Sequence, residues 1–321
     1  MSNMISLSDQ IDKVFLVAKP AIEDEGEDGC YCCRDGNRAI AAVFDGCGGL
    51  GSRRYATYNG HTGAYMSSRI ASGVAHDCFH SMKDKSDKSG KAFYHKYLRY
   101  LQKSYSKVTE MCSNERSLIR GALVRDFPCT AAIAYVSVEE KSVSVDCMWA
   151  GDSRVYILYE KGLMQMTVDD LDVSDAMKNL SADGALTNVI SSDGNYEIHG
   201  RSLELKRPAL IFAATDGCFG YLNSPMEFEY VLIGCMMGAD GPANFENRLY
   251  EVFEQHAQDD FTFGGIAIGF GTFDNMKKNF EERYRILQEK YIIPIKKARD
   301  SDSVRNELWE QYRIHYEHYI R

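Results

Sequence analysis

Short apolar runs that adjoin acidic residues recur along this chain. The clearest is the unbroken run at residues 39–44, which stops abruptly at Asp45-Gly46. A run with no polar interruption is typical of a strand that is buried on both faces. Because a carboxylate at the end of a rigid strand is held in place, it suits a hard cation such as Mg²⁺ or Mn²⁺. Similar acidic turns beside predicted strands occur at Gly151-Asp152-Ser153-Arg154, Thr215-Asp216-Gly217 and Asp259-Asp260.

The remaining apolar pattern predicts a mixture of strands and helices. Strands are predicted at 14–18, 30–33, 130–138, 142–149, 155–159, 162–166, 209–214 and 266–270, with a hairpin turn at 34–37. The strands between 130 and 166 should form an antiparallel meander. Helical spacing of apolar residues predicts helices at about 64–78, 91–112, 226–237 and 242–257. Asn59 or Thr62 suits the N-cap of the first helix, and residues 171–203 should form a short helix and loops.

Two amphipathic helical patterns follow the last predicted strand, which should end near Phe273. Pro294 and residues 300–303 separate them, and Ser301 or Ser303 suits the N-cap of the second helix. Their apolar positions are Phe280, Tyr284, Leu287 and Tyr291, then Val304, Leu308, Tyr312, His315 and Tyr319. Such stripes cover either the core of this chain or a partner protein, and we expect the core because exposed aromatic stripes are a liability. We therefore divide the chain into a domain at 1–273 and a helical extension at 274–321.

Composition and charge narrow the classes of function. The chain has 321 residues, of which 45% are hydrophobic, and this length allows a large buried core. The net charge of -9 argues against a nucleic-acid surface, which needs clustered Lys and Arg. No apolar run approaches the about 18 residues of a membrane span, and Met1 to Gln10 does not have the pattern of a signal peptide. We expect a cytoplasmic protein without a membrane partner, in which the ten cysteines are reduced thiols.

Other residues of types that can bind metals or nucleotides are better explained by packing than by a binding site. The cluster Cys30-x-Cys32-Cys33 has no second Cys or His pair at zinc spacing, so small apolar residues on a strand are the favoured interpretation. Residues 46–51 are glycine-rich, but no Gly-Lys-Ser/Thr follows to make a nucleotide-binding loop. Four histidines without ligand spacing are interpreted as surface or helix-packing residues: His61, His76, His80 and His95.

Taken in order, the acidic motifs resemble those of the metal-dependent PPM phosphatases, the type 2C class. The resemblance covers residues 10–273 and is carried by Glu27-Asp28, Asp45-Gly46-x-Gly48-Gly49, Cys129-Thr130-Ala131-Ala132, Gly151-Asp152-Ser153-Arg154, Ala214-Thr215-Asp216-Gly217 and Asp259-Asp260-x-Thr262. Each motif alone is common in turns, but their order and their placement at strand ends make the set specific. The resemblance implies an α+β fold. This fold is a four-layer α-β-β-α sandwich with two antiparallel sheets flanked by helices, here followed by the C-terminal helical extension.

The same resemblance implies a function and a set of metal ligands. It implies a bacterial-type phosphoprotein phosphatase in signalling, which hydrolyses phosphoserine or phosphothreonine with two Mn²⁺ or Mg²⁺ ions. The nucleophile would be a metal-bound water, so no residue has a covalent catalytic role. Thr130 is expected only to support the site. The implied ligands are the carboxylates of Asp28, Asp45, Asp216 and Asp259 and the carbonyl of Gly46. Asp45 should bridge the two ions. Glu27 is a further candidate, and Asp152 is a candidate ligand of a third ion.

The chain departs from the family pattern at three places. Cys47 stands where many members carry a His that acts as a general acid, and it is interpreted as a packing residue or a proton donor. Gly220 stands where the family often has a further Asp, which weakens a third metal at Asp152. The family's phosphate-binding Arg is missing, and the candidates to replace it are Arg34, Arg38, Arg53 and Arg54. These departures keep open an alternative function, a phosphatase-like binding or regulatory module with little or no turnover, whose C-terminal helices hold a partner protein.

Overall fold

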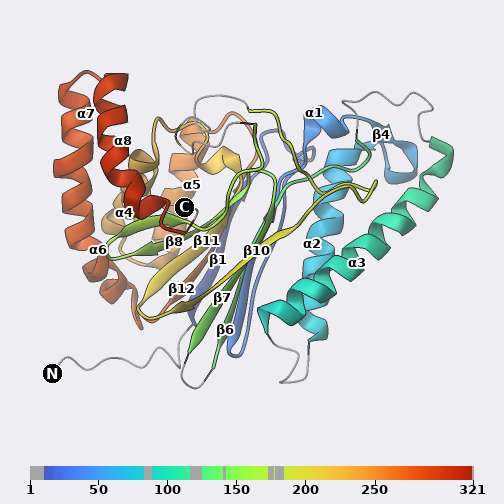
Figure 1. Cartoon of the computed structure of the whole chain (residues 1–321), viewed down its shortest axis with the longest axis horizontal. Helices are drawn as coiled ribbons and strands as arrows, with labels where there is room; N and C mark the ends of the chain where they lie inside the picture. The colour runs from blue at the N-terminus through green and yellow to red at the C-terminus, as the bar shows by residue number, and fades with distance from the viewer. Residues whose placement is uncertain are drawn as a thin grey trace.

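Two five-stranded antiparallel sheets lie face to face at the centre of the molecule, with helices outside each sheet (Figure 1). The structure is a computed structural model and describes residues 11–82, 89–115, 125–139, 142–172, 177 and 184–319. The first sheet has the strand order β1 (Ile11–Lys19), β12 (Phe261–Ile268), β11 (Ala209–Ala214), β8 (Arg154–Tyr159) and β9 (Gly162–Gln165). The second has the order β10 (His199–Leu205), β7 (Val143–Ala150), β6 (Ala131–Val138), β3 (Arg38–Phe44) and β2 (Gly29–Asp35). The predicted four-layer α+β sandwich is therefore confirmed.

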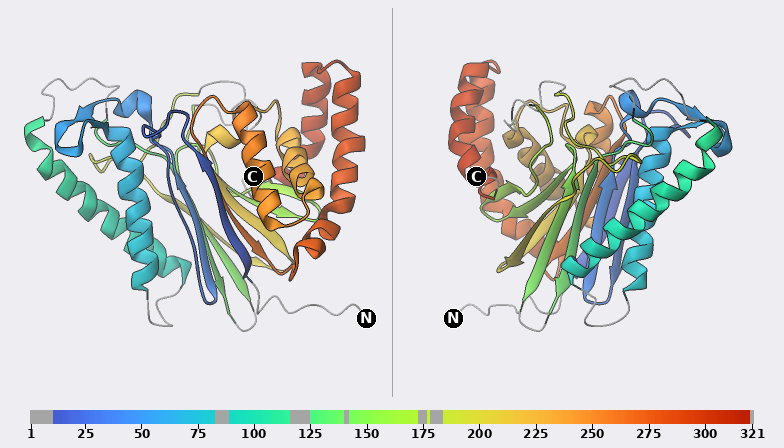
Figure 2. Two further views of the ribbon diagram at one scale, coloured as in Figure 1. Left: turned by 180° about the vertical axis from the view of Figure 1, so that it is seen from behind. Right: turned by 45° about the vertical axis from the view of Figure 1, so that its right-hand side comes forward.

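Helices cover the outer face of each sheet (Figure 2). The second sheet is covered by α2 (Gly63–Ser81) and α3 (Gly90–Met111), and the first by α4 (Pro225–Gly238), α5 (Pro242–His256) and the C-terminal helices. The shorter elements are α1 (Gly48–Gly51), β4 (Arg54–Tyr55), η2 (Ala56–Tyr58), β5 (His61–Thr62), η4 (Ser113–Glu115) and η6 (Asp216–Cys218). In the described part of the chain, every helix falls short of the length or the apolarity that crossing a membrane requires.

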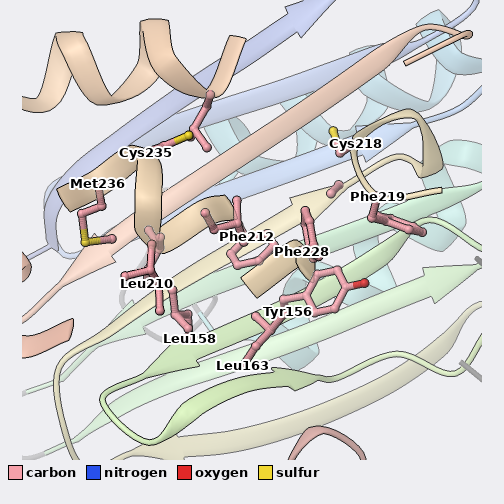
Figure 3. Close-up of a cluster of buried hydrophobic side chains, with 14 of the residues drawn as sticks. Tyr156, Leu158, Leu163, Leu210, Phe212, Cys218, Phe219, Phe228, Cys235 and Met236 are labelled. Carbon is pink, nitrogen blue, oxygen red and sulfur yellow. The ribbon is translucent and has the colours of Figure 1, made fainter. Parts of the chain in front are cut away.

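The apolar run before Asp45 forms β3, and both of its faces are buried as the sequence predicts. Ala39, Ala41 and Val43 face the interior between the two sheets, whereas Ile40, Ala42 and Phe44 face α2 and α3. The first sheet has the same construction, with a separate cluster of side chains between its outer face and α4 (Figure 3). The positions from Ala39 to Phe44 are all apolar and buried, so the first carboxylate after them stands at the end of β3.

The strands between 130 and 166 do not form the single meander that the sequence predicts. β6 and β7 pair in the second sheet, whereas β8 and β9 pair in the first. The turn at Gly151-Asp152-Ser153 therefore carries the chain from one sheet to the other. Residues 199–205 form the edge strand β10 where loops were expected, and the last strand ends at Ile268 rather than near Phe273.

The C-terminal helices pack on the first sheet, as expected from their aromatic stripes. α6 (Phe273–Leu287) continues through the π-helical turn η7 (Gln288–Ile292) into α7 (Ile293–Lys297), and α8 (Asp302–Tyr316) follows. Pro294 lies in the first turn of α7 and does not separate helices, and Ser301 precedes α8 without a side-chain cap. The buried stripe of α8 is displaced by one residue from the predicted one and contains Arg305, Trp309, Tyr312 and Tyr316. The predicted boundary at residue 273 stays a prediction.

Candidate active site

Asp45 follows β3 directly and is fixed by hydrogen bonds of its backbone. Its N–H donates to Oγ1 of Thr130 at 3.3 Å, and its carbonyl accepts from the N–H of Thr130 at 2.8 Å. The Thr130 hydroxyl also lies 2.6 Å from Oγ of Ser153, in the turn that carries Asp152. Gly151 precedes this turn at a φ of 90°, where a side chain would be strained and would collide with Thr130. Thr130 thus holds two acidic turns together, which is the supporting place that the sequence predicts for it.

Asp28 connects the two sheets at the same end of the sandwich. It precedes β2 of the second sheet, but its Oδ2 accepts hydrogen bonds from two threonine hydroxyls beside the first sheet. Thr215, which precedes Asp216, donates at 2.9 Å, and Thr262 in β12 donates at 2.7 Å. The two threonines also bond to each other, since the N–H of Thr262 donates to Oγ1 of Thr215 at 2.9 Å. Asp28 is therefore oriented by the strand ends that carry Asp216 and Asp259.

Asp260 is a structural residue that sequence reasoning missed. Its carboxylate is buried and accepts hydrogen bonds from the backbone N–H groups of Ala21, Glu27 and Asp28. The side chain of the exposed Asp259 accepts from the N–H of Asp260 at 2.8 Å. Asp260 therefore fixes the backbone that presents the two acidic residues before β2.

A cavity of about 300 Å³ opens beside these residues, near α1 at the upper end of the sheets in Figure 1. Four of the predicted ligand positions line it, namely Glu27, Asp45, Gly46 and Asp259. Glu27 accepts a hydrogen bond from the Thr62 hydroxyl, and a side chain at Gly48 would collide with the Glu27 carboxylate. Glycine at position 48 thus leaves room for the Glu27 carboxylate beside the chain after Asp45.

The carboxylates are near enough for their charges to act on one another. Burial raises the pKa of Asp45 well above its usual range, and Asp216, Asp28, Asp152 and Asp259 raise it further. Burial, together with the charges of Asp260 and Asp216, raises the pKa of Asp28 to about 8 against the opposing hydrogen bonds of Thr262 and Thr215. Burial and the charge of Asp216 likewise raise the pKa of Asp152 to about 8. Like charges at low solvent exposure disfavour ionisation, and a bound cation would reverse this preference.

These side chains fit divalent ions by their chemistry. All of them offer oxygen, which Mg²⁺ and Mn²⁺ prefer. The nearby Arg154 is paired with another carboxylate, since its Nε and Nη2 donate to the two oxygens of Asp169 at 2.9 and 2.6 Å. Within the described ranges, however, no three His, Cys, Asp or Glu side chains already form a group that could hold one ion. The assignment of Asp28, Asp45, Gly46, Asp216 and Asp259 as ligands, with Glu27 and Asp152 as candidates, stays a prediction.

The structure also places the residues at which the chain departs from the family pattern. Cys47 does not line the cavity, and burial raises the pKa of its thiol well above the usual range, which fits packing better than proton donation. Gly220 approaches the carbonyl of Asp216, to which its N–H donates, so a larger residue there would be crowded. Of the four candidate arginines, only Arg54 lines the cavity. The other three have partners elsewhere: Arg34 donates to the carbonyls of Ile11 and Gly36, and Arg38 pairs with Asp35. The guanidinium of Arg53 lies over the Tyr55 ring.

The part of the cavity lining that lies between Asp45 and α2 in the chain was not predicted. Between Asp45 and α2 the chain forms the hairpin of β4 and β5, in which Arg54 pairs with Thr62 and Tyr55 with His61. Arg54, His61 and Thr62 line the cavity together with Tyr65 from the first turn of α2. Thr62 is also the N-cap of α2, where its hydroxyl accepts from the N–H of Tyr65 at 3.0 Å. His61, interpreted from the sequence as a surface or packing residue, therefore belongs to the candidate site.

Solved structures that match this fold include serine/threonine phosphatases of bacteria. The phosphatase of Staphylococcus aureus is 14% identical with a TM-score of 0.60, and the match covers 84% of this chain and 99% of that one. PppA of Pseudomonas aeruginosa is 14% identical with a TM-score of 0.57, covering 80% of this chain and 97% of that one. PstP/Ppp of Mycobacterium tuberculosis is 15% identical with a TM-score of 0.56, covering 79% and 97%. At these identities the likeness establishes the fold.

The sequence itself carries the family assignment. No curated protein sequence matches the chain. The sequence profile of the family described as protein phosphatase 2C, in contrast, matches residues 23–254. This range contains the whole second sheet, strands β8, β9 and β11 of the first sheet, α2 to α4 and most of α5, and all of the acidic turns except Asp259-Asp260. The chain belongs to the protein phosphatase 2C family.

Proposed function

We propose that this protein is a metal-dependent phosphoprotein phosphatase that hydrolyses phosphoserine or phosphothreonine. The observation that carries the proposal is the set of mutually repelling carboxylates around Asp45, at the edge of a cavity of about 300 Å³. When bound there, two Mn²⁺ or Mg²⁺ ions would neutralise the charge on a phosphate ester and activate the attacking water.

The residues of the chain have distinct parts in this proposal. Asp45, Asp216 and Asp259 would hold the ions from strand ends, with the carbonyl of Gly46 and the carboxylate of Asp28 completing the set. Thr215, Thr262 and Thr130 would keep these groups in position through the hydrogen bonds described above. Because the ligands come from rigid strand ends, their positions should change little when a substrate binds.

One observation favours the alternative, a phosphatase-like binding or regulatory module with little or no turnover. In the part of the chain that is described, no group of three side chains is ready to hold a metal ion. Such a module would bind a phosphoprotein without hydrolysing it, and the C-terminal helices are the place where a partner protein would bind.

A metal titration separates the two functions. The protein, stripped with EDTA, should gain activity towards a phosphoserine peptide as Mn²⁺ or Mg²⁺ is added, and calorimetry should detect the binding of the ions. Asp45→Asn should abolish activity and weaken metal binding while the circular dichroism spectrum is unchanged. Metal binding without turnover, or turnover that Asp45→Asn leaves intact, would contradict the proposed enzyme.

A further inference from the structure

Carboxylates and residues of a short hairpin line the same cavity beside Asp45. The carboxylates include Glu27, Asp45 and Asp259, and the 54–62 hairpin with the start of α2 contributes Arg54, His61 and Tyr65. Since a phosphate monoester is a dianion, the carboxylates cannot bind it without cations, whereas Arg54 offers a positive charge of its own. The hairpin wall is defined here as Arg54, His61 and Tyr65.

Arg54 is positioned by the hairpin but remains available to a ligand. Its Nη1 donates to the carbonyl of Gly60 at 3.1 Å, which fixes the side chain against its own hairpin. Its Nη2 pairs with Oε2 of Glu25 at 3.2 Å, where the two side chains are 57% and 55% exposed. An ion pair this exposed is weak, so a phosphate dianion can replace Glu25 on the guanidinium.

His61 is held at the cavity by its ring face and not by its nitrogens. The imidazole stacks on Tyr65 with ring centroids 4.0 Å apart and ring planes 9° from parallel. Within the described residues neither ring nitrogen takes part in a hydrogen bond. A half-buried imidazole with a fixed plane and free nitrogens can donate a proton to a group that enters the cavity.

We propose that the hairpin wall receives the phosphoester end of a phosphoserine or phosphothreonine side chain. Arg54 binds the non-bridging oxygens, and His61 donates a proton to the leaving oxygen. The inference rests on the phosphatase function proposed above and adds the residues that recognise the ester. Other proton donors fit less well, because the Cys47 thiol does not line the cavity and a tyrosine hydroxyl is in general a much weaker acid than an imidazolium.

The proton transfer balances with water as the only co-reactant. The oxygen of the attacking water forms a bond to phosphorus and releases one proton to solvent. The bond between phosphorus and the serine oxygen breaks with its electron pair on that oxygen, which takes the proton of the His61 imidazolium. Solvent then protonates His61 again, and the products are serine and hydrogen phosphate. An alkoxide is a poor leaving group, so this proton matters for serine, whereas nitrophenolate departs without one.

Two substrates with different leaving groups test the role of His61. In His61→Gln, kcat/KM for a phosphoserine peptide should fall by about 10²–10⁴-fold, the usual contribution of a general acid, whereas hydrolysis of p-nitrophenyl phosphate should change little. The alkaline limb of the peptide pH profile, but not of the aryl phosphate profile, should be lost. The control His256→Gln, on the exposed face of α5, should affect neither substrate. An equal loss on both substrates would overturn the proton-donor role.

That pH profile reflects His61 in a charged environment. The ionisable or charged groups that line the same cavity are Arg54 from the hairpin, Tyr65 from α2, Glu25 and Glu27 from the turn before β2, Asp45 after β3, and Asp259 and Asp260 before β12. Bound divalent ions would change the charge around all of these groups. The profile should therefore be recorded at a saturating and constant Mg²⁺ concentration.

The role of Arg54 is tested by comparing its substitution with the same substitution at the neighbouring Arg53. Arg54→Gln should raise KM for both substrates, whereas Arg53→Gln, at a position that does not line the cavity, should not. Thermal unfolding of every variant shows whether it folds. A KM that is raised equally by the two substitutions would overturn the role of Arg54.

A binding measurement separates failure of this inference from failure of the proposed function. In protein labelled with ¹⁵N-histidine, the His61 ring signal is assigned by its loss in His61→Gln and followed as inorganic phosphate is added with Mg²⁺. The signal should shift in the wild type and not in Arg54→Gln. If the wild type hydrolyses neither substrate, the proposed function fails and this titration decides the binding role of the wall. An unresponsive His61 signal overturns that role.

Discussion

A buried ion pair joins the C-terminal helices to the phosphatase core. Arg283 of α6 donates from Nε and Nη2 to the two oxygens of Glu229 in α4, at 2.7 and 2.6 Å. Tyr312 of α8 donates its hydroxyl to Oε2 of the same carboxylate at 2.6 Å. Glu229 has no exposed surface, and Arg283 is only 8% exposed. Burial alone lowers the pKa of Arg283, but the charge and hydrogen bonds of Glu229 raise it overall, so the guanidinium stays charged.

Removing one member of this network should lower stability strongly. Arg283→Met keeps most of the side-chain volume but leaves the Glu229 charge buried without its cation, a change that costs about 3–5 kcal/mol. At about 2–4 °C per kcal/mol for a large domain, the midpoint of thermal unfolding should fall by roughly 6–20 °C. Tyr312→Phe removes one hydrogen bond to a charged group, which costs about 1.5–3 kcal/mol.

The control and the double variant make this reasoning refutable. Arg285 lies on the same helix and pairs with Glu282 and Glu289, but it is exposed, so Arg285→Met should shift the midpoint little. Adding Glu229→Gln to Arg283→Met should recover part of the loss, because the stranded charge is then removed. Scanning calorimetry measures all of these midpoints. Equal shifts for Arg283→Met and Arg285→Met would mean that α6 and α8 do not stabilise the core through this network.

Two further predictions concern the candidate site. In EDTA the midpoint of thermal unfolding should fall as the pH rises from about 5 to about 8. The reason is that burial and neighbouring carboxylates raise the pKa of Asp28 and Asp152 to about 8 in the folded chain. Aspartates of the unfolded chain titrate near pH 4, at about their ordinary pKa. The folded chain then holds more protons than the unfolded chain throughout that window, and Mn²⁺ should restore the midpoint at pH 8; a midpoint independent of pH in EDTA would contradict this. Cys47→Ser should leave hydrolysis of peptide and aryl phosphates nearly unchanged, since the thiol does not line the cavity, and a loss confined to the peptide in a steady-state assay would make it a participant.

The strands and the acidic turns could be predicted because their signals are local. An apolar run such as 39–44 must be buried, and an Asp that follows it directly must stand at a strand end. Strand β10 gave no such signal, because it is an edge strand whose residues alternate between half-buried and exposed. The sequence also predicted the wrong buried face for α8. Arg305 occupies a buried position there, a place that an apolar pattern does not assign to arginine.

The hairpin wall and Asp260 could not be predicted for a different reason. Strands of two residues, such as β4 and β5, are too short for any periodicity to appear. The role of Asp260 depends on three backbone N–H groups more than 230 residues earlier in the chain, at Ala21, Glu27 and Asp28. Neither feature has a distinctive residue pattern in the sequence. The partners come together only when the two sheets pack. His61 could have been noticed only by its place between two acidic motifs.

The same hydrogen bonds make some site residues better probes of function than others. Asp28 accepts hydrogen bonds from Thr215 and Thr262, and Asp260 holds the turn before β2, so both carboxylates join the two sheets as well as support the site. Substituting either one would lower stability and activity together, and the two effects could not be separated. The side chain of Asp45, by contrast, makes no hydrogen bond within the described residues, although its charge interacts with four other aspartates. Asp45→Asn therefore removes charge at the centre of the site with little loss of structure, which makes it the decisive variant for distinguishing an enzyme from a binding module.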